Sequence, residues 1–134
     1  MSVTPIYAGL IAILFVALSA RVIAARRSAR VVLGDGGDKA LLRRLRVQGN
    51  CAEYAPLALV LMTLAELQSA PVLVLHAIGL MLLIGRTVHA VGVSQEHEPF
   101  TFRVTGMALT FTAILSAAGF NLFGPTLLAT IAAR

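Results

Sequence analysis

Residues 5–25 read PIYAGLIAILFVALSARVIAA, an apolar run interrupted only by Arg21. About 20 apolar residues, at a helical rise of about 1.5 Å each, cross a hydrocarbon core of about 30 Å. The basic residues follow this run, whereas a cleavable signal peptide carries them before its apolar stretch. The run therefore predicts an uncleaved first membrane span.

The composition of the whole chain agrees with a membrane protein. Its 134 residues are 58% hydrophobic and only 13% charged, with a mean hydropathy of +0.88. Soluble domains carry about 25% charged residues, so this chain has too few to cover a water-facing surface. It has no tryptophan and two tyrosines, which argues against the stacking platforms of a single-strand nucleic-acid binder; no nucleic-acid partner is expected.

Three further apolar segments complete the expected architecture. We expect one all-α membrane domain over residues 1–134, a four-helix bundle whose spans cover about 5–25, 47–68, 71–93 and 102–122. The connector Arg26–Arg46 has a turn at its Gly34–Asp38 centre, and Lys39–Arg46 should already be helical.

The distribution of basic residues predicts the orientation of the bundle. Ten of the eleven lie in or beside the first and third connectors. The positive-inside rule then places both of these connectors in the cytoplasm and both termini outside.

Polar residues in the spans indicate a site. A charged group inside a span costs about 2.5–3.5 kcal/mol and usually faces a partner or a cavity. Arg46, Asn50 and Glu53 fall within about 60° of one another around the second helix, with Tyr54 beside them. Arg86 and His89 share a face of the third helix, and Arg103 opens the fourth.

Two interpretations of this polar set stay open. In the first, the groups satisfy one another, with Glu53 paired to Arg46 or Arg86 and Asn50 joining helices by hydrogen bonds. In the second, they line a site for a small molecule with two carboxylates and an ammonium group. Arginine binds carboxylates with two parallel hydrogen bonds, and Glu53 would take the amine.

The start of the second helix, Arg46-x-Gln48-x-Asn50-Cys51-x-Glu53-Tyr54-x-Pro56, resembles the signature of the MAPEG family (membrane-associated proteins in eicosanoid and glutathione metabolism). It is most similar to leukotriene-C synthase and the microsomal glutathione transferases. The resemblance covers about Leu41–Phe123 and implies a homotrimer that binds glutathione, its co-substrate, between subunits near the cytoplasmic side.

The resemblance also assigns roles to residues. It implies that glutathione is held by a binding set and that one catalytic arginine, Arg103, faces the thiol. The binding set is Arg46, Gln48, Asn50, Glu53, Tyr54, Arg86 and His89. His89 and Val93 stand where eicosanoid members have tyrosines, so a leukotriene synthase is not expected. A general transferase or peroxidase of the bacterial inner membrane, acting on a lipophilic electrophile, fits better.

Two other functions remain as alternatives. A non-catalytic protein of the same fold would bind glutathione or a similar anion without turnover. A small multidrug-type exporter would need a membrane carboxylate in the first helix, which has none.

Other polar and small residues have simpler interpretations. Glu96-His97-Glu98 reads as a solvated loop, so no metal is expected, and the lone Cys51 reads as packing. Glu66 is expected to reach water at the outer end of the second helix. Small residues in the fourth helix predict a packing surface: Gly106, Thr110, Ala113 and Ala117.

Overall fold

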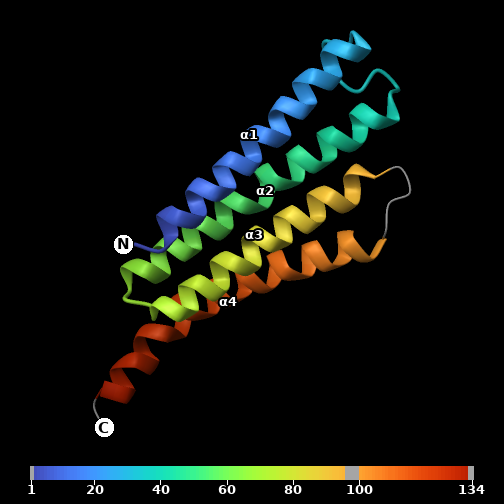
Figure 1. Ribbon diagram of the computed structural model, residues 1–134. Helices are drawn as coiled ribbons and strands as arrows, with labels where there is room; N and C mark the ends of the chain where they lie inside the picture. Colours follow the sequence, from blue (N-terminus) through green and yellow to red (C-terminus); the bar gives the residue numbers. More distant parts are fainter. Residues whose placement is uncertain (1, 96–99, 133–134) are drawn as a thin grey trace.

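The computed structural model describes residues 2–95 and 100–132. Within this part of the chain there are four helices and no strand: α1 (Thr4–Ala29), α2 (Lys39–Leu67), α3 (Val72–Ser94) and α4 (Phe100–Ala132). They lie side by side in one bundle (Figure 1). The N-terminus and the α2–α3 turn share one end. The opposite end, here named the connector end, carries the α1–α2 connector (residues 30–38), the last turn of α3 and the first turn of α4. The expected all-α four-helix fold is confirmed.

Three of the described helices are long and apolar enough to cross a membrane. They are Thr4–Ala29, Val72–Ser94 and Phe100–Gly124, with mean hydropathies of 2.3, 1.8 and 1.5. The helix α2 is long enough, with 29 residues, but it is not among them because its first half carries the polar residues of the predicted site. The last turns of α4 run to Ala132, further than the expected span, and extend past the rest of the bundle (Figure 1).

The sequence explains where α2 begins. The Asp38 carboxylate accepts hydrogen bonds from the backbone N–H groups of Ala40 (2.7 Å) and Leu41 (3.0 Å), which is the arrangement of a helix N-cap. The preceding turn uses left-handed backbone at Gly34, Gly36 and Gly37. Residues 39–46 are helical, as predicted, so the arginines of this segment have fixed positions on one helix.

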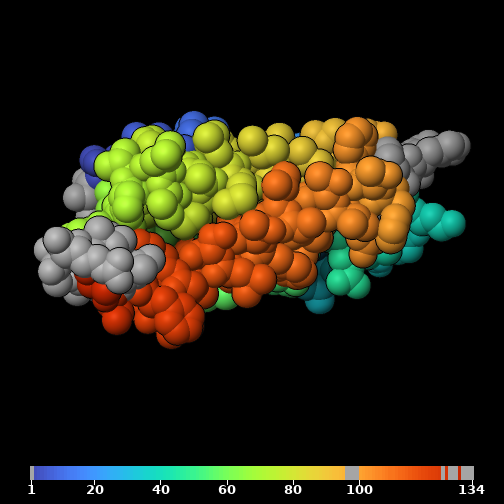
Figure 2. All heavy atoms as spheres, turned by 90° about the horizontal axis from the view of Figure 1, so that it is seen from below, coloured from blue at the N-terminus to red at the C-terminus, as the bar shows by residue number. Residues whose placement is uncertain are grey.

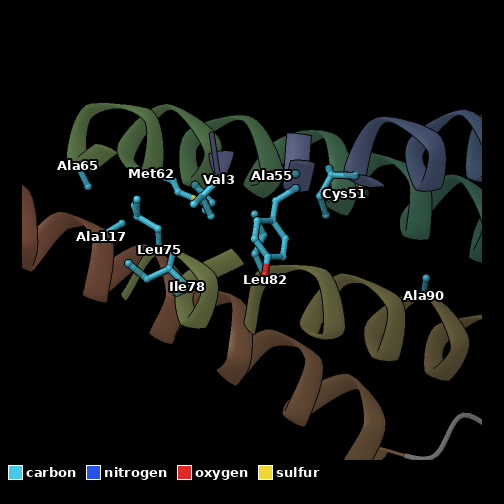
Figure 3. Close-up of a cluster of buried hydrophobic side chains, with 14 of the residues drawn as sticks. Val3, Cys51, Ala55, Met62, Ala65, Leu75, Ile78, Leu82, Ala90 and Ala117 are labelled. Carbon is cyan, nitrogen blue, oxygen red and sulfur yellow. The ribbon is translucent and has the colours of Figure 1, made fainter. Parts of the chain in front are cut away.

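The buried core lies between the helices. Met62 of α2 and Leu75 and Ile78 of α3 belong to one apolar cluster and point into the space between neighbouring helices (Figure 3). The predicted packing surface of α4 is confirmed: Thr110, Ala113 and Ala117 are each 0% exposed, and Gly106 is buried.

The helices α3 and α4 approach each other closely through glycines. A Cβ added at Gly106 would lie 2.7 Å from the Cβ atom of His89, and one added at Gly85 would lie 2.9 Å from the Gly106 carbonyl oxygen. Figure 2 shows α4 (orange) lying along α3 (yellow-green). This contact fixes His89 beside the first turns of α4, close in sequence to Arg103.

At the opposite end of the bundle, Glu66 has a role that the sequence did not predict. Its carboxylate accepts hydrogen bonds from the backbone N–H groups of Ser2, Val3 (2.9 Å) and Thr4 (2.9 Å). These are donors at the start of a helix that have no intrahelical partner. Glu66 therefore caps α1 and ties it to the end of α2, instead of only reaching water.

Candidate functional site

A cavity of about 730 Å³ lies at the connector end, between α2, α3 and α4. This size is within the usual range of small-molecule sites, about 300–1,000 Å³. The second helix supplies most of the wall, α3 supplies two residues and α4 supplies one. The lining residues are Leu42, Arg43, Leu45, Arg46, Gly49, Asn50, Glu53, His89, Val93 and Arg103.

The structure brings five of the eight predicted site residues to this cavity and leaves three outside it. Those that line it are Arg46, Asn50, Glu53, His89 and Arg103. The three outside are Gln48, Tyr54 and Arg86. One cavity thus brings together residues from three helices, although the outermost two, Arg46 and Arg103, lie 57 positions apart in the sequence.

Helical geometry accounts for the contribution of α2. At about 100° per residue, Arg43, Arg46, Asn50 and Glu53 fall within about 80° of arc. Gln48 lies about 180° from the centre of that arc, on the opposite side of the helix. The same count shows that Arg43 could have been found from the sequence, because it stands three residues before Arg46 on the cavity face. In the sequence alone, Arg43 is one of several basic residues of the first connector and has no predicted role in the site.

Arg86 is buried behind the cavity wall, 2% exposed. Its Nε donates to Thr110 Oγ1 (2.9 Å), one terminal nitrogen donates to the side-chain oxygen of Asn50, and the other contacts Met107 Sδ (3.3 Å). Among residues 2–95 and 100–132 no carboxylate pairs with it. Arg86 therefore contacts the cavity through Asn50 and not with its own guanidinium.

Tyr54 packs in the same network. Its ring centroid lies 5.6 Å from the guanidinium carbon of Arg86, a cation–π distance, and 5.5 Å from the ring of Phe111 in an edge-to-face arrangement. The Cys51 side chain, 3% exposed, belongs to the apolar core. Tyr54 and Arg86 thus join α2, α3 and α4 behind the cavity.

The orientation of Asn50 follows from the chemistry of its partner. A guanidinium has only donors, so the carbonyl oxygen of the amide must face Arg86 and the NH₂ group is left for other partners. Asn50 also lines the cavity, and its bond to Arg86 occupies the oxygen, so the group that the amide can offer to a ligand there is the NH₂ donor.

The described lining of the cavity contains more basic than acidic side chains. Arg43, Arg46 and Arg103 contribute three guanidinium groups, and Glu53 contributes one carboxylate. Within the described residues no ion pair joins Glu53 to Arg46 or Arg86. The other part of the first interpretation is confirmed, because Asn50 joins α2 to α3 through its hydrogen bond with Arg86. Such a wall suits an anionic ligand that also has a positive group, since arginine binds carboxylates with two parallel bonds.

No group of three metal-ligating side chains occurs in the part of the chain that the structure describes. The segment Glu96-His97-Glu98, interpreted above as a loop, lies outside the described residues.

Comparisons with known proteins agree with the fold. The model of the MAPEG family matches residues 4–123. Two Escherichia coli proteins, from strains K12 and CFT073, are each named inner membrane protein YecN. Each is 39% identical to this chain over 113 residues, which are 84% of this chain and 85% of the relative.

Proposed function

The chain belongs to the MAPEG family of membrane proteins, and we propose that it is a glutathione-dependent transferase or peroxidase of the bacterial inner membrane. It would activate the glutathione thiol near the cytoplasmic side of the bilayer and transfer it to a lipophilic electrophile. The observation that carries this proposal is the 730 Å³ cavity, which combines three arginines, an amide donor and one glutamate.

The cavity matches the charges of glutathione, which has two carboxylates, one ammonium group and a thiol. Arg43 and Arg46 stand one turn apart on α2, so their guanidinium groups can bind carboxylates from the same wall. Glu53, on the same arc of the helix, is suited to the ammonium group. The Asn50 amide can donate to a carbonyl or carboxylate oxygen.

Arg103 has the role of holding the thiolate. A thiol is mostly protonated at pH 7, and the thiolate is the nucleophile. A guanidinium beside the sulfur favours loss of the proton to water. In the transferase reaction the sulfur then forms a bond to an electrophilic carbon, and a leaving group departs or the product takes up a proton. In the peroxidase reaction two glutathiones become one disulfide, while the hydroperoxide becomes an alcohol and water.

The proposal includes a homotrimer. Arg46 and Glu53 are exposed on the subunit surface, although α2 is packed in a membrane bundle. A charge exposed to lipid costs several kcal/mol, about 2.5–3.5 on insertion scales. A neighbouring copy that covered this face would remove the cost and close the cavity. The orientation that puts the basic connector end in the cytoplasm follows from the positive-inside rule.

The first experiment is a titration of the detergent-purified protein with glutathione, followed by the ultraviolet absorbance of the thiolate. We expect a saturable signal that Arg103→Ala abolishes with a smaller effect on affinity. Arg46→Ala should weaken binding of glutathione. Arg44→Ala is the matched control, because it removes the same charge at a residue that does not line the cavity. Equal effects of Arg46→Ala and Arg44→Ala would refute the assignment of the cavity.

A second function, binding without catalysis, is favoured by one observation. The two residues that α3 contributes to the cavity wall, His89 and Val93, carry no hydroxyl group that could contact a bound ligand. Saturable binding with no thiolate signal and no turnover of several electrophiles would support this function over the first.

A further inference from the structure

The α1–α2 connector carries an exposed apolar pair beside a dense group of basic side chains. Val32 is 94% exposed and Leu33 is 89% exposed, which is unusual for two adjacent aliphatic residues at a turn. Eight of the eleven basic residues of the chain lie between positions 21 and 46. None of the residues that line the cavity belongs to the connector itself.

Hydrogen bonds hold the backbone of the connector in a defined conformation. One terminal nitrogen of Arg26 donates to the carbonyl oxygens of Val32 (3.3 Å) and Gly34 (2.8 Å). Arg30, in left-handed conformation with φ 54°, ends α1, and its backbone N–H bonds back to the Arg27 carbonyl oxygen. These contacts hold the backbone of Val32 and its neighbours, while the Val32 and Leu33 side chains remain outside any described core.

The length of α1 places this connector at the level of lipid headgroups. Its 26 residues span about 39 Å at about 1.5 Å per residue. The hydrocarbon core is about 30 Å thick, and about 40–45 Å with the headgroup regions. The end of α1 and the residues after it therefore extend into a headgroup region, and Figure 2 shows the connector (teal) projecting at this end of the bundle.

Two exposed arginines lie beside Val32 and Leu33 at the level of the lipid headgroups. Arg27 and Arg30 are exposed, and no hydrogen bond or ion pair of either side chain occurs among the described residues. Arg27 lies in the last turn of α1 and Arg30 is the residue that ends the helix, so both side chains belong to the same end of α1. The acidic residues of the connector are engaged locally: Asp35 accepts from the Gly37 N–H and Asp38 caps α2.

We propose that Arg27 at the end of α1 and the connector residues Arg30, Val32 and Leu33 form a binding site for anionic phospholipids of their own leaflet. The two arginines bind the phosphate and headgroup, and the aliphatic pair enters the boundary between headgroups and acyl chains. Clusters of basic residues directly beside a membrane helix attract anionic lipid, at about 1 kcal/mol for each residue. This site is independent of the ligand that the cavity binds.

The test uses the absence of tryptophan from the chain. The Leu33→Trp variant is placed in nanodiscs of phosphatidylcholine, with or without phosphatidylglycerol. Its emission is quenched in turn by lipids brominated near the glycerol end of the acyl chain and by iodide in water. Leu115→Trp, at a position 70% exposed in the middle of α4, is the control inside the hydrocarbon core.

We expect the Leu33→Trp reporter to be quenched by brominated lipid and protected from iodide, more strongly when phosphatidylglycerol is present. Arg27→Gln and Arg30→Gln, in the same background, should each lower the preference for phosphatidylglycerol about fivefold, and added salt should weaken it. The control should respond to brominated lipid in both lipid mixtures.

Three results would overturn the proposal. The first is quenching by iodide and not by lipid, which would indicate a connector that faces water or a soluble partner. The second is quenching by lipid that does not depend on phosphatidylglycerol. The third is a phosphatidylglycerol preference that survives removal of both arginines.

Discussion

The hydrogen bond from Arg86 to Thr110 gives a sharp test of the network behind the cavity. The Thr110 hydroxyl is 0% exposed; it accepts from Arg86 Nε at 2.9 Å and donates to the Gly106 carbonyl oxygen at 2.8 Å. Thr110→Val has nearly the same shape and removes this acceptor. The change leaves one N–H of a buried guanidinium without a partner.

General values for hydrogen bonds set limits on the free energy of unfolding that Thr110→Val should cost. A hydrogen bond to a charged group contributes about 1.5–3 kcal/mol in soluble proteins. Side-chain bonds between membrane helices contribute less, about 0.6 kcal/mol on average and about 1.7 at most. Because this bond is fully buried and its donor is charged, we expect the top of the membrane range, about 1.5 kcal/mol.

The assay is a double-mutant cycle with Arg86→Met, in which the free energy of unfolding in mixed detergent micelles is followed by circular dichroism. In the Arg86→Met background, Thr110→Val places one apolar side chain against another and should be nearly neutral. The two changes should therefore couple by about 1.5 kcal/mol. Additivity within about 0.5 kcal/mol would mean that the bond does not stabilise the bundle, and the reasoning would fail.

Three further predictions concern packing, capping and the cavity. Gly106→Ala should destabilise the bundle by about 1–3 kcal/mol, because its Cβ would lie 2.7 Å from a residue of α3; thermal unfolding should show no such loss for Gly119→Ala, where nothing lies within 4 Å. The backbone N–H groups of Leu41 and Ala40 lower the pKa of Asp38 below its ordinary 3.8. The ionised Asp38 therefore stabilises the first turn of α2 fully at pH values above about 3.8. This stabilisation is lost as the pH falls through the lower pKa of Asp38 in the folded state. In Asp38→Asn, which keeps a capping side chain, a helicity titration in acid should lack this transition. Asn50→Asp should preserve or raise the free energy of unfolding, because a carboxylate then faces Arg86, but it should lower the affinity of the cavity for an anion. If unfolding and binding measurements showed that the variant loses both stability and affinity, the orientation of the amide would be contradicted.

The fold was predictable because its signals are local. Apolar runs long enough to cross a bilayer, separated by polar or glycine-rich turns, indicate the helices without any knowledge of how they pack. The boundaries were less predictable, since α4 continues to Ala132 through Gly124-Pro125, a pair that normally marks a turn or the end of a helix. The capping role of Glu66 joins positions more than 60 residues apart, and no local pattern contains that information.

The candidate site was predictable along one helix and less so between helices. The arc of Arg46, Asn50 and Glu53 follows from helical period alone, and all three line the cavity. Arg86 and His89 share a face of α3, yet only His89 lines the cavity, because the close approach of α4 at Gly106 places Thr110 and Met107 around the Arg86 guanidinium. Whether a side chain is buried between two helices or reaches the cavity depends on such contacts, and not on the spacing of residues within either helix.

The arrangement of Arg86 explains how a cation stays inside this bundle with no carboxylate beside it among the described residues. A buried charge needs compensation, and here it comes from neutral groups: a hydroxyl, an amide oxygen and a thioether, together with the face of an aromatic ring. A carboxylate in place of the Asn50 amide would neutralise Arg86 more strongly, but it would offer the cavity only acceptors. The amide satisfies the arginine with its oxygen and keeps its NH₂ group for the cavity. The same side chain thus stabilises the bundle and leaves the positive character of the cavity to Arg43, Arg46 and Arg103.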